Sequence, residues 1–167
     1  MTDDHIKLDT PVPLQLDEHV RLAATIARAI FDGAKVLDPM VHAIAGDGKH
    51  LVLSVPQLGG TDAEKDAVAV GLRDVFKQHG VTQYVMLTEA WGLYLPTGTD
   101  INNLPRPRDR KDRFEMITLQ GETKDHCTCG QMIITRDADG NPTLGELETW
   151  DGGTSYGRLT GLLKTAN

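Results

Sequence analysis

The first clear pattern in the chain is a set of apolar residues at helical spacing. From about Asp17 to Asp32 an apolar residue returns every three or four positions, at Val20, Ala23, Ala24, Ala27, Ile30 and Phe31. This spacing gathers the apolar side chains on one side of an α-helix. We therefore expect a first amphipathic helix that ends at Gly33.

A hairpin and a second helix are predicted next. The β-prone runs 40–45 and 50–55 are joined by Gly46-Asp47-Gly48, in which glycine supplies the positive φ angles of a tight turn. Further on, Thr61 is followed three residues later by Glu64, the pair that caps a helix N-terminus reciprocally. We expect this helix to run to about His79 and to end at Gly80.

Residues 81–90 form a strand with apolar side chains on both faces, which is typical of a central strand covered on both sides. Because a helix separates it from the second hairpin strand, we expect the two strands to be parallel, through a right-handed crossover, in a mixed sheet. The polar stretch 96–107 contains three prolines and predicts a long surface loop. Strands at about 113–120, 127–136 and 144–150 then complete an antiparallel meander.

The predicted fold class is therefore α+β: a single domain with a mixed, largely antiparallel sheet and two main helices, in the order α-β-β-α-β-β-β-β. We assign residues 1–16 to a mobile N-terminal segment, residues 17–150 to the domain and residues 151–167 to a glycine-rich tail. Its expected anchors are Tyr156, Leu159, Leu162 and Leu163. Such a tail is able to fray, to dock or to meet a partner.

Composition narrows the class of protein. The 167 residues are 40% hydrophobic and 25% charged, values typical of one globular domain. The formal net charge of −7 disfavours general attraction to nucleic acid or anionic membranes. No apolar run approaches the ~20 residues of a membrane span, and the two cysteines are separated by one residue, which suits no ordinary disulfide. We expect a reducing cytoplasmic location and no membrane partner.

Metal chemistry is suggested most by the string His126-Cys127-Thr128-Cys129, because thiolate and imidazole are good zinc ligands. On a strand Cys127 and Cys129 point to one face and His126 to the other. A four-ligand site would need His42, His50 or a second subunit. The interpretation we favour is two small, half-buried strand residues, with no cofactor and no nucleophilic role.

Glu89 and Trp91 close the predicted central strand, where ligand crevices form in sheets that contain parallel strands. Glu89 is a weak candidate for a catalytic base or metal ligand. We favour a structural carboxylate that pairs with an arginine or caps a backbone group. Trp91 is a candidate binding residue, although an anchor in the core or at its rim is the simpler interpretation.

A cationic cluster follows in the loop. It consists of Arg106, Arg108, Arg110, Lys111 and Arg113, interrupted by Asp109 and Asp112. These arginines are candidate binding residues for phosphate or for an acidic partner. The alternative is a solvated loop neutralised by its own aspartates. Because no aromatic residues are interleaved to stack on bases, we do not favour nucleic-acid binding.

Two further strings are weaker. Gly59-Gly60-Thr61 precedes a helix, as anion-binding loops do, but acidic residues follow and no P-loop spacing is present. Asp137-Ala138-Asp139-Gly140 is similar to the start of a calcium loop, but the later bidentate glutamate is missing. We interpret the second string as a turn.

Two short motifs, Thr88-Glu89-Ala90-Trp91 and Asp112-Arg113-Phe114-Glu115, are separated by the proline-containing loop. Together they resemble a loose group of uncharacterised bacterial and phage-associated proteins with an (S/T)EAW strand end and a DR-x-E strand start. The resemblance covers roughly residues 82–120 and implies no activity. It suggests a latch in which Arg110 or Arg113 pairs with Glu89 and holds the loop over Trp91.

Our leading hypothesis is a non-enzymatic accessory or interaction protein, a homo-oligomer that uses a sheet edge, the long loop or the tail as its contact surface. The second is a small metal-dependent hydrolase or metal-binding protein around Glu89, His42, His50 or the cysteines. The third is recognition of phosphate or nucleic acid through the 106–113 arginine loop.

Overall fold

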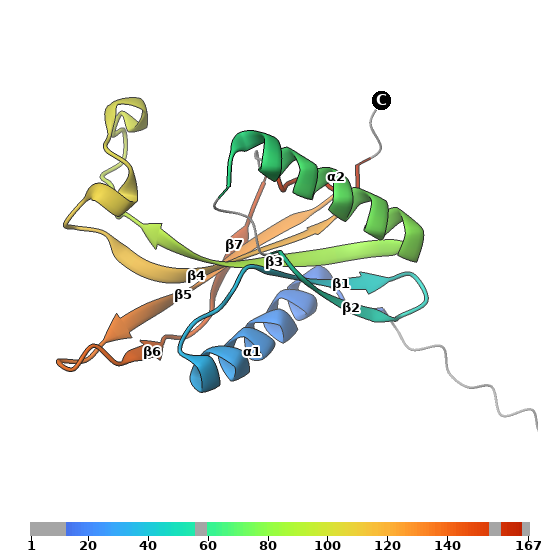
Figure 1. The fold of residues 1–167 in the computed structure, drawn as a ribbon, viewed down its shortest axis with the longest axis horizontal. Helices are drawn as coiled ribbons and strands as arrows, with labels where there is room; N and C mark the ends of the chain where they lie inside the picture. Colours follow the sequence, from blue (N-terminus) through green and yellow to red (C-terminus); the bar gives the residue numbers. More distant parts are fainter. Residues whose placement is uncertain (1–12, 56–59, 154–157, 165–167) are drawn as a thin grey trace, which may run out of the picture.

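The computed structural model describes residues 13–55, 60–153 and 158–164, and its elements form an α+β domain (Figure 1). The order is α1 (Leu16–Ala34), β1 (Met40–Ala45), β2 (His50–Ser54), α2 (Asp62–His79), β3 (Val81–Gly92), β4 (Phe114–Thr123), β5 (Cys127–Arg136), β6 (Pro142–Leu144) and β7 (Glu148–Asp151). Two short 3-10 turns, Ile101–Asn103 and Pro107–Asp109, lie between β3 and β4. The predicted fold class is confirmed. Most of the predicted N-terminal segment, residues 1–12, lies outside the described residues.

Helix α1 begins one residue earlier and ends two residues later than predicted. Glu18 accepts a hydrogen bond from the Gln15 backbone N–H at 2.9 Å, which closes a capping box at the N-terminus. The helix continues through Gly33, and Lys35 adopts the left-handed conformation (φ 61°) and donates its N–H to the Phe31 carbonyl at 2.7 Å. Gly33 was therefore the wrong terminator, because the chain turns two residues later.

Helix α2 confirms the prediction closely. The Thr61 hydroxyl accepts from the Glu64 N–H at 3.3 Å, and the Glu64 carboxylate accepts from the Thr61 N–H at 2.6 Å. Gly80 ends the helix with φ 63°. Ala69, Leu72 and Phe76 are its buried residues and pack on the sheet.

The seven described strands form one sheet in the order β2-β1-β3-β4-β5, with β6 and β7 both paired to the outer edge of β5. The ladders between them are all antiparallel. Since β1 lies between β2 and β3, these two strands run in the same direction without touching. The expected direction of β3 is thus right, but within the described residues the parallel pair, and with it a mixed sheet, is absent.

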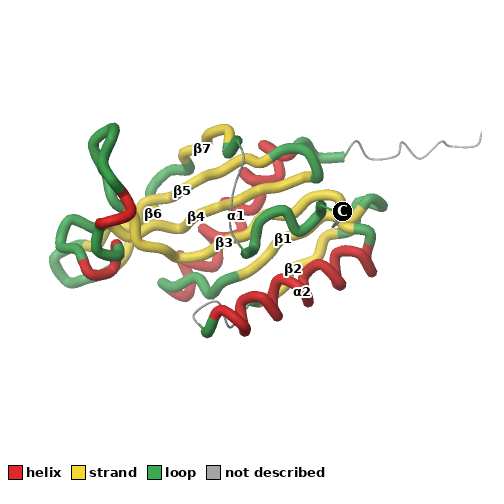
Figure 2. Tube along the Cα trace, turned by 90° about the horizontal axis from the view of Figure 1, so that it is seen from above, coloured by secondary structure: helices red, strands yellow, loops and turns green. Residues whose placement is uncertain are grey.

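The helices cover opposite faces of the sheet (Figure 1). Under α1 lies a core that includes Val85, Leu87, Ile117 and Met132. Under α2 lies a second core that includes Val41, Ala43, Tyr84 and Met86. Seen from above, α2 lies along the β1–β2 side of the sheet (Figure 2). Thr118 of β4 and Gln131 of β5, on that face beyond the reach of α2, are therefore only half-buried.

The predicted last strand, 144–150, is two short strands instead of one. Two residues of β5 lie between Gln131 and Ile134, whereas three lie between their partners Glu148 and Leu144, so one extra residue bulges out. The Arg28 guanidinium of α1 donates to the carbonyls of Leu144 and Gly145 at this bulge. The interruption therefore comes from a tertiary contact.

The C-terminal segment 158–164 docks against the domain. Leu162 is buried at 4% exposure, and Leu159 and Leu163 pack beside it. Arg158 forms ion pairs with Asp62 and Asp66 of α2, at 3.1 and 2.8 Å. Three of the four predicted anchors thus lie in a docked segment, while the fourth, Tyr156, lies outside the described residues.

A search of the described residues for a helix long and apolar enough to cross a bilayer found none.

Candidate functional site

The region that brings most of the predicted site residues together is the connection between β3 and β4, residues 93–113, which we call the arm. It stands away from the two helices at one end of the sheet (Figure 1). None of its residues is buried. Tyr94 and Ile101 are 73% and 69% exposed. The predicted long loop is therefore a projecting segment, and it carries apolar side chains outward.

Local hydrogen bonds give the arm a defined shape. The Thr99 N–H and hydroxyl both donate to the Pro96 carbonyl, at 3.2 and 2.6 Å. The Asp100 carboxylate accepts from the Asn102 N–H at 3.0 Å and from the Asn103 side chain at 2.8 Å. Short polar side chains that bond nearby backbone groups are what stabilises such turns.

Aromatic and cationic side chains meet at the base of the arm. The Arg113 guanidinium lies over the Trp91 ring, 4.2 Å from its centroid. The Tyr94 and Phe114 rings stack with centroids 4.5 Å apart. Beside them is an open hollow of about 560 Å³, lined by Trp91, Arg110, Lys111, Arg113 and four neighbouring residues. Trp91 is thus a half-exposed rim residue that touches one of the predicted arginines.

The remaining cations of the arm divide into paired and unpaired groups. Arg110 donates two hydrogen bonds to Asp112, at 2.8 and 2.6 Å, and Arg108 lies 3.8 Å from Asp109. Among the described residues no carboxylate pairs with Arg106 or Lys111, and both side chains are exposed. The aspartates therefore neutralise only part of the cluster, and two positive charges stay available at the surface.

Glu89 does not form the predicted latch. Its carboxylate accepts a hydrogen bond from the Leu37 N–H at 2.6 Å, while Arg110 pairs with Asp112 and Arg113 covers Trp91. The side chain ties the α1–β1 connection to β3. The prediction that Glu89 caps a backbone group thus matches its observed contact, and the proposed arginine pairing is wrong because both arginines have nearer partners.

Cys127 and Cys129 lie on one face of β5 with their sulfurs 4.0 Å apart, as the strand period requires. Both are free and half-buried. Burial, reinforced by the neighbouring Cys129 thiol and by Glu122, raises the pKa of the Cys127 thiol to about 12. A thiol that keeps its proton at neutral pH is a poor nucleophile.

His42 and His50 belong to a chain of hydrogen bonds on the other face of the sheet, which is buried at His19 and His42 and ends at the exposed His50. Gln83 Oε1 lies 3.2 Å from His19 Nδ1, His19 Nε2 lies 3.1 Å from His42 Nδ1, and His42 Nε2 lies 3.0 Å from His50 Nδ1. The Gln83 amide nitrogen donates to the Leu14 carbonyl, so its oxygen must accept from His19. Each ring then donates its Nδ1 hydrogen toward Gln83. This order fixes the tautomers of His19 and His42.

Burial keeps the rings of His19 and His42 neutral. It lowers the pKa of His19 to about 4, helped by the neighbouring His42, and lowers that of His42 with help from His50. His42 pairs with Val85 under α1, whereas Cys127 pairs with Glu122 on the α2 face. The predicted histidine and cysteine ligands therefore cannot share one ion. Within the described ranges no three His, Cys, Asp or Glu side chains converge as a metal site.

A buried acid on the α2 face holds the C-terminal segment. Glu122 is 4% exposed and accepts from the Tyr84 hydroxyl at 2.8 Å, the Gly161 N–H at 2.7 Å and the Gln120 amide at 2.6 Å. Burial and Glu122 raise the pKa of Tyr84 well above its usual range, so the phenol stays a donor. The tail is docked on this polar anchor as well as on its leucines.

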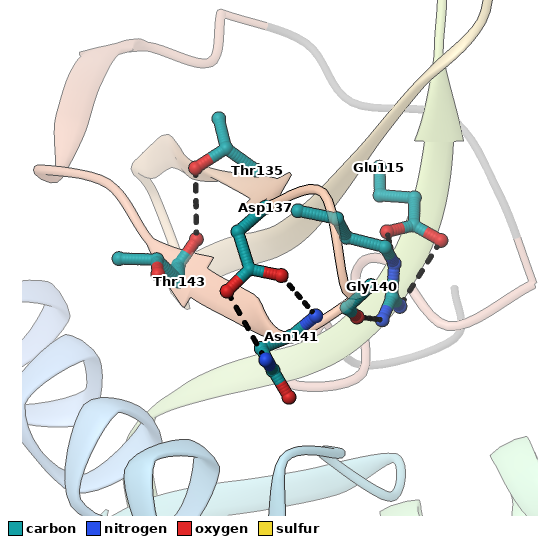
Figure 3. Close-up of polar contacts among 7 residues, drawn as sticks. Glu115, Thr135, Asp137, Gly140, Asn141 and Thr143 are labelled. Atoms are coloured by element: carbon teal, nitrogen blue, oxygen red, sulfur yellow. Dashed lines mark hydrogen bonds and ion pairs between the residues drawn. The ribbon is translucent and has the colours of Figure 1, made fainter.

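The described residues of the two weaker sequence motifs, Gly59-Gly60-Thr61 and Asp137-Ala138-Asp139-Gly140, have local structural roles. Gly59 lies outside the described residues, and the Glu64 carboxylate occupies the space beside Gly60 at the α2 N-terminus. Asp137 accepts from the N–H group and the side chain of Asn141 (Figure 3). It also accepts from the Asp139 N–H group. Its oxygens thus build the β5–β6 turn, as predicted. Next to it, Arg136 bridges Glu115 at 2.7 Å.

His19, Gln83 and Glu122 were not identified from the sequence. His19 occurs on the apolar stripe of α1, one turn before Ala23, so a polar residue on the predicted core face was the available signal. Gln83 and Glu122 carry no such signal, because strand alternation predicts only which face a residue occupies and does not identify its hydrogen-bond partner.

Comparison of the chain with protein-family models, with curated proteins and with solved structures gave no match.

Proposed function

We propose that this protein is a non-enzymatic interaction protein whose arm binds an acidic, partly apolar surface of a partner protein. The observation that carries the proposal is that the arm has a defined shape and yet contains no buried residue, although it presents Tyr94 and Ile101 at 73% and 69% exposure. Exposed apolar groups gathered on one segment favour a contact surface.

The residue types of the arm and its base support this role. Tyrosine, tryptophan and arginine carry much of the binding energy at protein interfaces, and here Trp91, Tyr94 and Arg113 lie together beside an open hollow. The hydrogen-bonded turns at Pro96–Asn103 hold the arm in shape before binding. Less conformational entropy is then lost on association.

Charge supports an acidic partner. The arm contains five basic and three acidic residues, in a chain whose formal net charge is −7. Because Arg106 and Lys111 have no described carboxylate partner, they are the side chains best placed to attract such a surface. The acidic remainder of a second copy is one surface of this kind. We therefore propose self-association as the first case to test, in a reducing compartment that suits the free thiols.

Site-specific photocrosslinking tests the proposal. A photoreactive residue at position 94 or 101 should give a crosslinked product of defined mass, whereas the same residue at Val70, exposed on α2, should not. The product would be a dimer with purified protein if the partner is a second copy, and a heterologous adduct in cell extract otherwise. Equal products from position 70, or none from 94 and 101, would refute the arm as the contact surface.

A charge variant sharpens the same test. Arg106→Glu with Lys111→Glu leaves the Arg110–Asp112 pair intact and should abolish the position-101 product. The matched control, Lys35→Glu with Arg73→Glu, changes the net charge equally at exposed positions away from the arm and should preserve it. Loss of the position-101 product in both variants would mean that net charge, and not the cations of the arm, controls the association.

A further inference from the structure

The thiol pair on β5 is the chemical group that the proposed interaction surface does not use. Cys127 and Cys129 project from the same face of a regular strand, their sulfurs are 4.0 Å apart, and both are half-buried and free. They are the only two cysteines of the chain. Two soft donors are therefore held close together without a covalent link.

The sulfur separation fits a metal ion placed between the two thiolates. With metal–sulfur bonds of about 2.3 Å, an ion bound to sulfurs 4.0 Å apart subtends an angle of about 120°. That is the angle of three-coordinate geometry, with one position left for solvent or an added ligand. A structural zinc site needs four ligands, and no third ligating side chain converges here within the described residues.

The backbone around the pair leaves room for it. Gly152 follows β7, and its N–H donates to the Cys127 carbonyl at 2.9 Å. A Cβ atom at this glycine would lie 2.6 Å from the Cys127 sulfur and 3.0 Å from the Cys129 sulfur. Any side chain at position 152 would therefore displace both thiols. Only glycine lets the main chain pack against the pair and preserve its spacing.

The electrostatic surroundings favour a cation. Glu122 is the register partner of Cys127, and Asp151 precedes Gly152. Both carboxylates interact electrostatically with the Cys127 sulfur. Their negative charges attract a cation to this position. On the same face as the sulfurs, a hollow of about 120 Å³, lined among others by Glu122 and Gly153, reaches Cys127 and supplies the entry path.

We propose that Cys127 and Cys129 bind one soft monovalent cation, Cu(I), as a bis-thiolate site with an open third position. Thiolate donors select Cu(I), and this ion accepts a low coordination number that the divalent ions of hard or borderline character do not favour. Binding breaks two S–H bonds, forms two Cu–S bonds and releases two protons to solvent, with no change of oxidation state.

The test is an anaerobic titration of the reduced, untagged full-length protein with Cu(I) against a chromogenic Cu(I) chelator. We expect one equivalent to bind, with ultraviolet thiolate-to-copper absorption and an affinity that rises with pH. Cys127→Ser and Cys129→Ser should each weaken binding by at least about 100-fold. Equal folding of the variants is checked by thermal melting, and Cys→Ala replacements at the same positions serve if serine proves unstable.

A glycine pair separates a built site from adventitious binding. Gly152→Ala should weaken Cu(I) binding by roughly tenfold or more by crowding both sulfurs. Gly71→Ala, on α2 with open space around it, should leave binding unchanged. The proposal fails if either serine variant binds within about threefold of the parent, if Gly152→Ala is without effect, or if Zn²⁺ displaces an equimolar amount of Cu(I).

Discussion

The C-terminal segment and the arm contain similar types of residue, but the first is docked on the domain and the second projects from it. Residues 158–164 and 93–113 both contain leucines set among glycine, threonine or proline. In the tail Leu162 is 4% exposed, whereas in the arm Ile101 is 69% exposed. The difference lies in which residues of the domain contact each segment. Segment 158–164 contacts Glu122, Tyr84 and the acidic start of α2. The described ring contacts of the arm lie at its base. Apolar content alone therefore does not decide whether a segment docks.

The largest expected effect comes from removing the acid that anchors the tail. Glu122→Ala leaves the Tyr84 hydroxyl, the Gly161 N–H and the Gln120 amide without their acceptor in a buried site. We expect the free energy of unfolding to fall by about 4 kcal/mol, measured by urea denaturation. Glu148→Ala, an exposed glutamate on β7, is the control and should change it by less than about 0.5 kcal/mol. Equal urea midpoints for the two variants would show that Glu122 does not anchor the C-terminal segment.

A matched pair of alanine substitutions measures the contrast directly. Leu162→Ala opens a cavity in the core under α2 and should cost about 2 to 3 kcal/mol, at the low end for a buried leucine because the site lies at the edge of that core. Ile101→Ala removes an exposed side chain and should stay within about 0.5 kcal/mol. Both are read from the same denaturant series. A costly Ile101→Ala would mean that the arm packs on the body.

Acid should destabilise the packed domain, including the docked C-terminal segment, and leave the arm unaffected. The pKa of His19 is lowered from 6.5 to about 4, so the unfolded chain binds more protons than the folded one between these values. Stability is therefore complete above pH 6.5 and falls as the pH drops toward 4, by about 3 kcal/mol. Amide exchange of Gly161, corrected for intrinsic rates, should speed up across this window, whereas that of Ile101 should not. His19→Gln should flatten the pH profile; an unchanged profile would exclude His19 as the source.

The smallest effect is expected at the ion pairs of Arg158. This guanidinium meets Asp62 and Asp66 but is 44% exposed, so solvent screens both pairs. Arg158→Ala should raise amide exchange locally at residues 161–162, with a shift in thermal midpoint smaller than that of Leu162→Ala. High salt should mimic the substitution. A midpoint as low as that of Leu162→Ala would make Arg158 a principal anchor.

The sequence predicted those elements whose signals are local. The capping pair Thr61 and Glu64, with Gly80 at the far end, placed α2 correctly because each residue acts on its own helix. The meander and the Asp137 turn follow from alternation and turn chemistry for the same reason. The position of the arm as a long connection was also readable from its prolines.

Features that depend on distant partners were not predictable. The last strand was split because Arg28 reaches its carbonyls from another element. The Glu89 latch failed for a related reason: the nearest donor was a backbone N–H from the α1–β1 connection. The end of α1 was missed for a different, local reason, because a lysine and not a glycine takes the left-handed conformation there. Which Gln, His or Glu becomes buried is set by strand order, and periodicity contains no information about it.

The split between β6 and β7 has a consequence for how sheets of this protein can add to one another. At the opposite border, β2 is an unbroken five-residue strand, His50–Ser54, without charge or proline, which is the type of edge that accepts another strand. The bulge that Arg28 fixes, together with Pro142 and the charged Glu148 and Asp151, makes the other border a poor template. Among the described strands, β2 is therefore the edge at which strand addition can start. In a dimer joined through the two β2 edges, the remaining sheet borders would be those of β6 and β7. The bulge would then keep further molecules from adding and so prevent fibre formation.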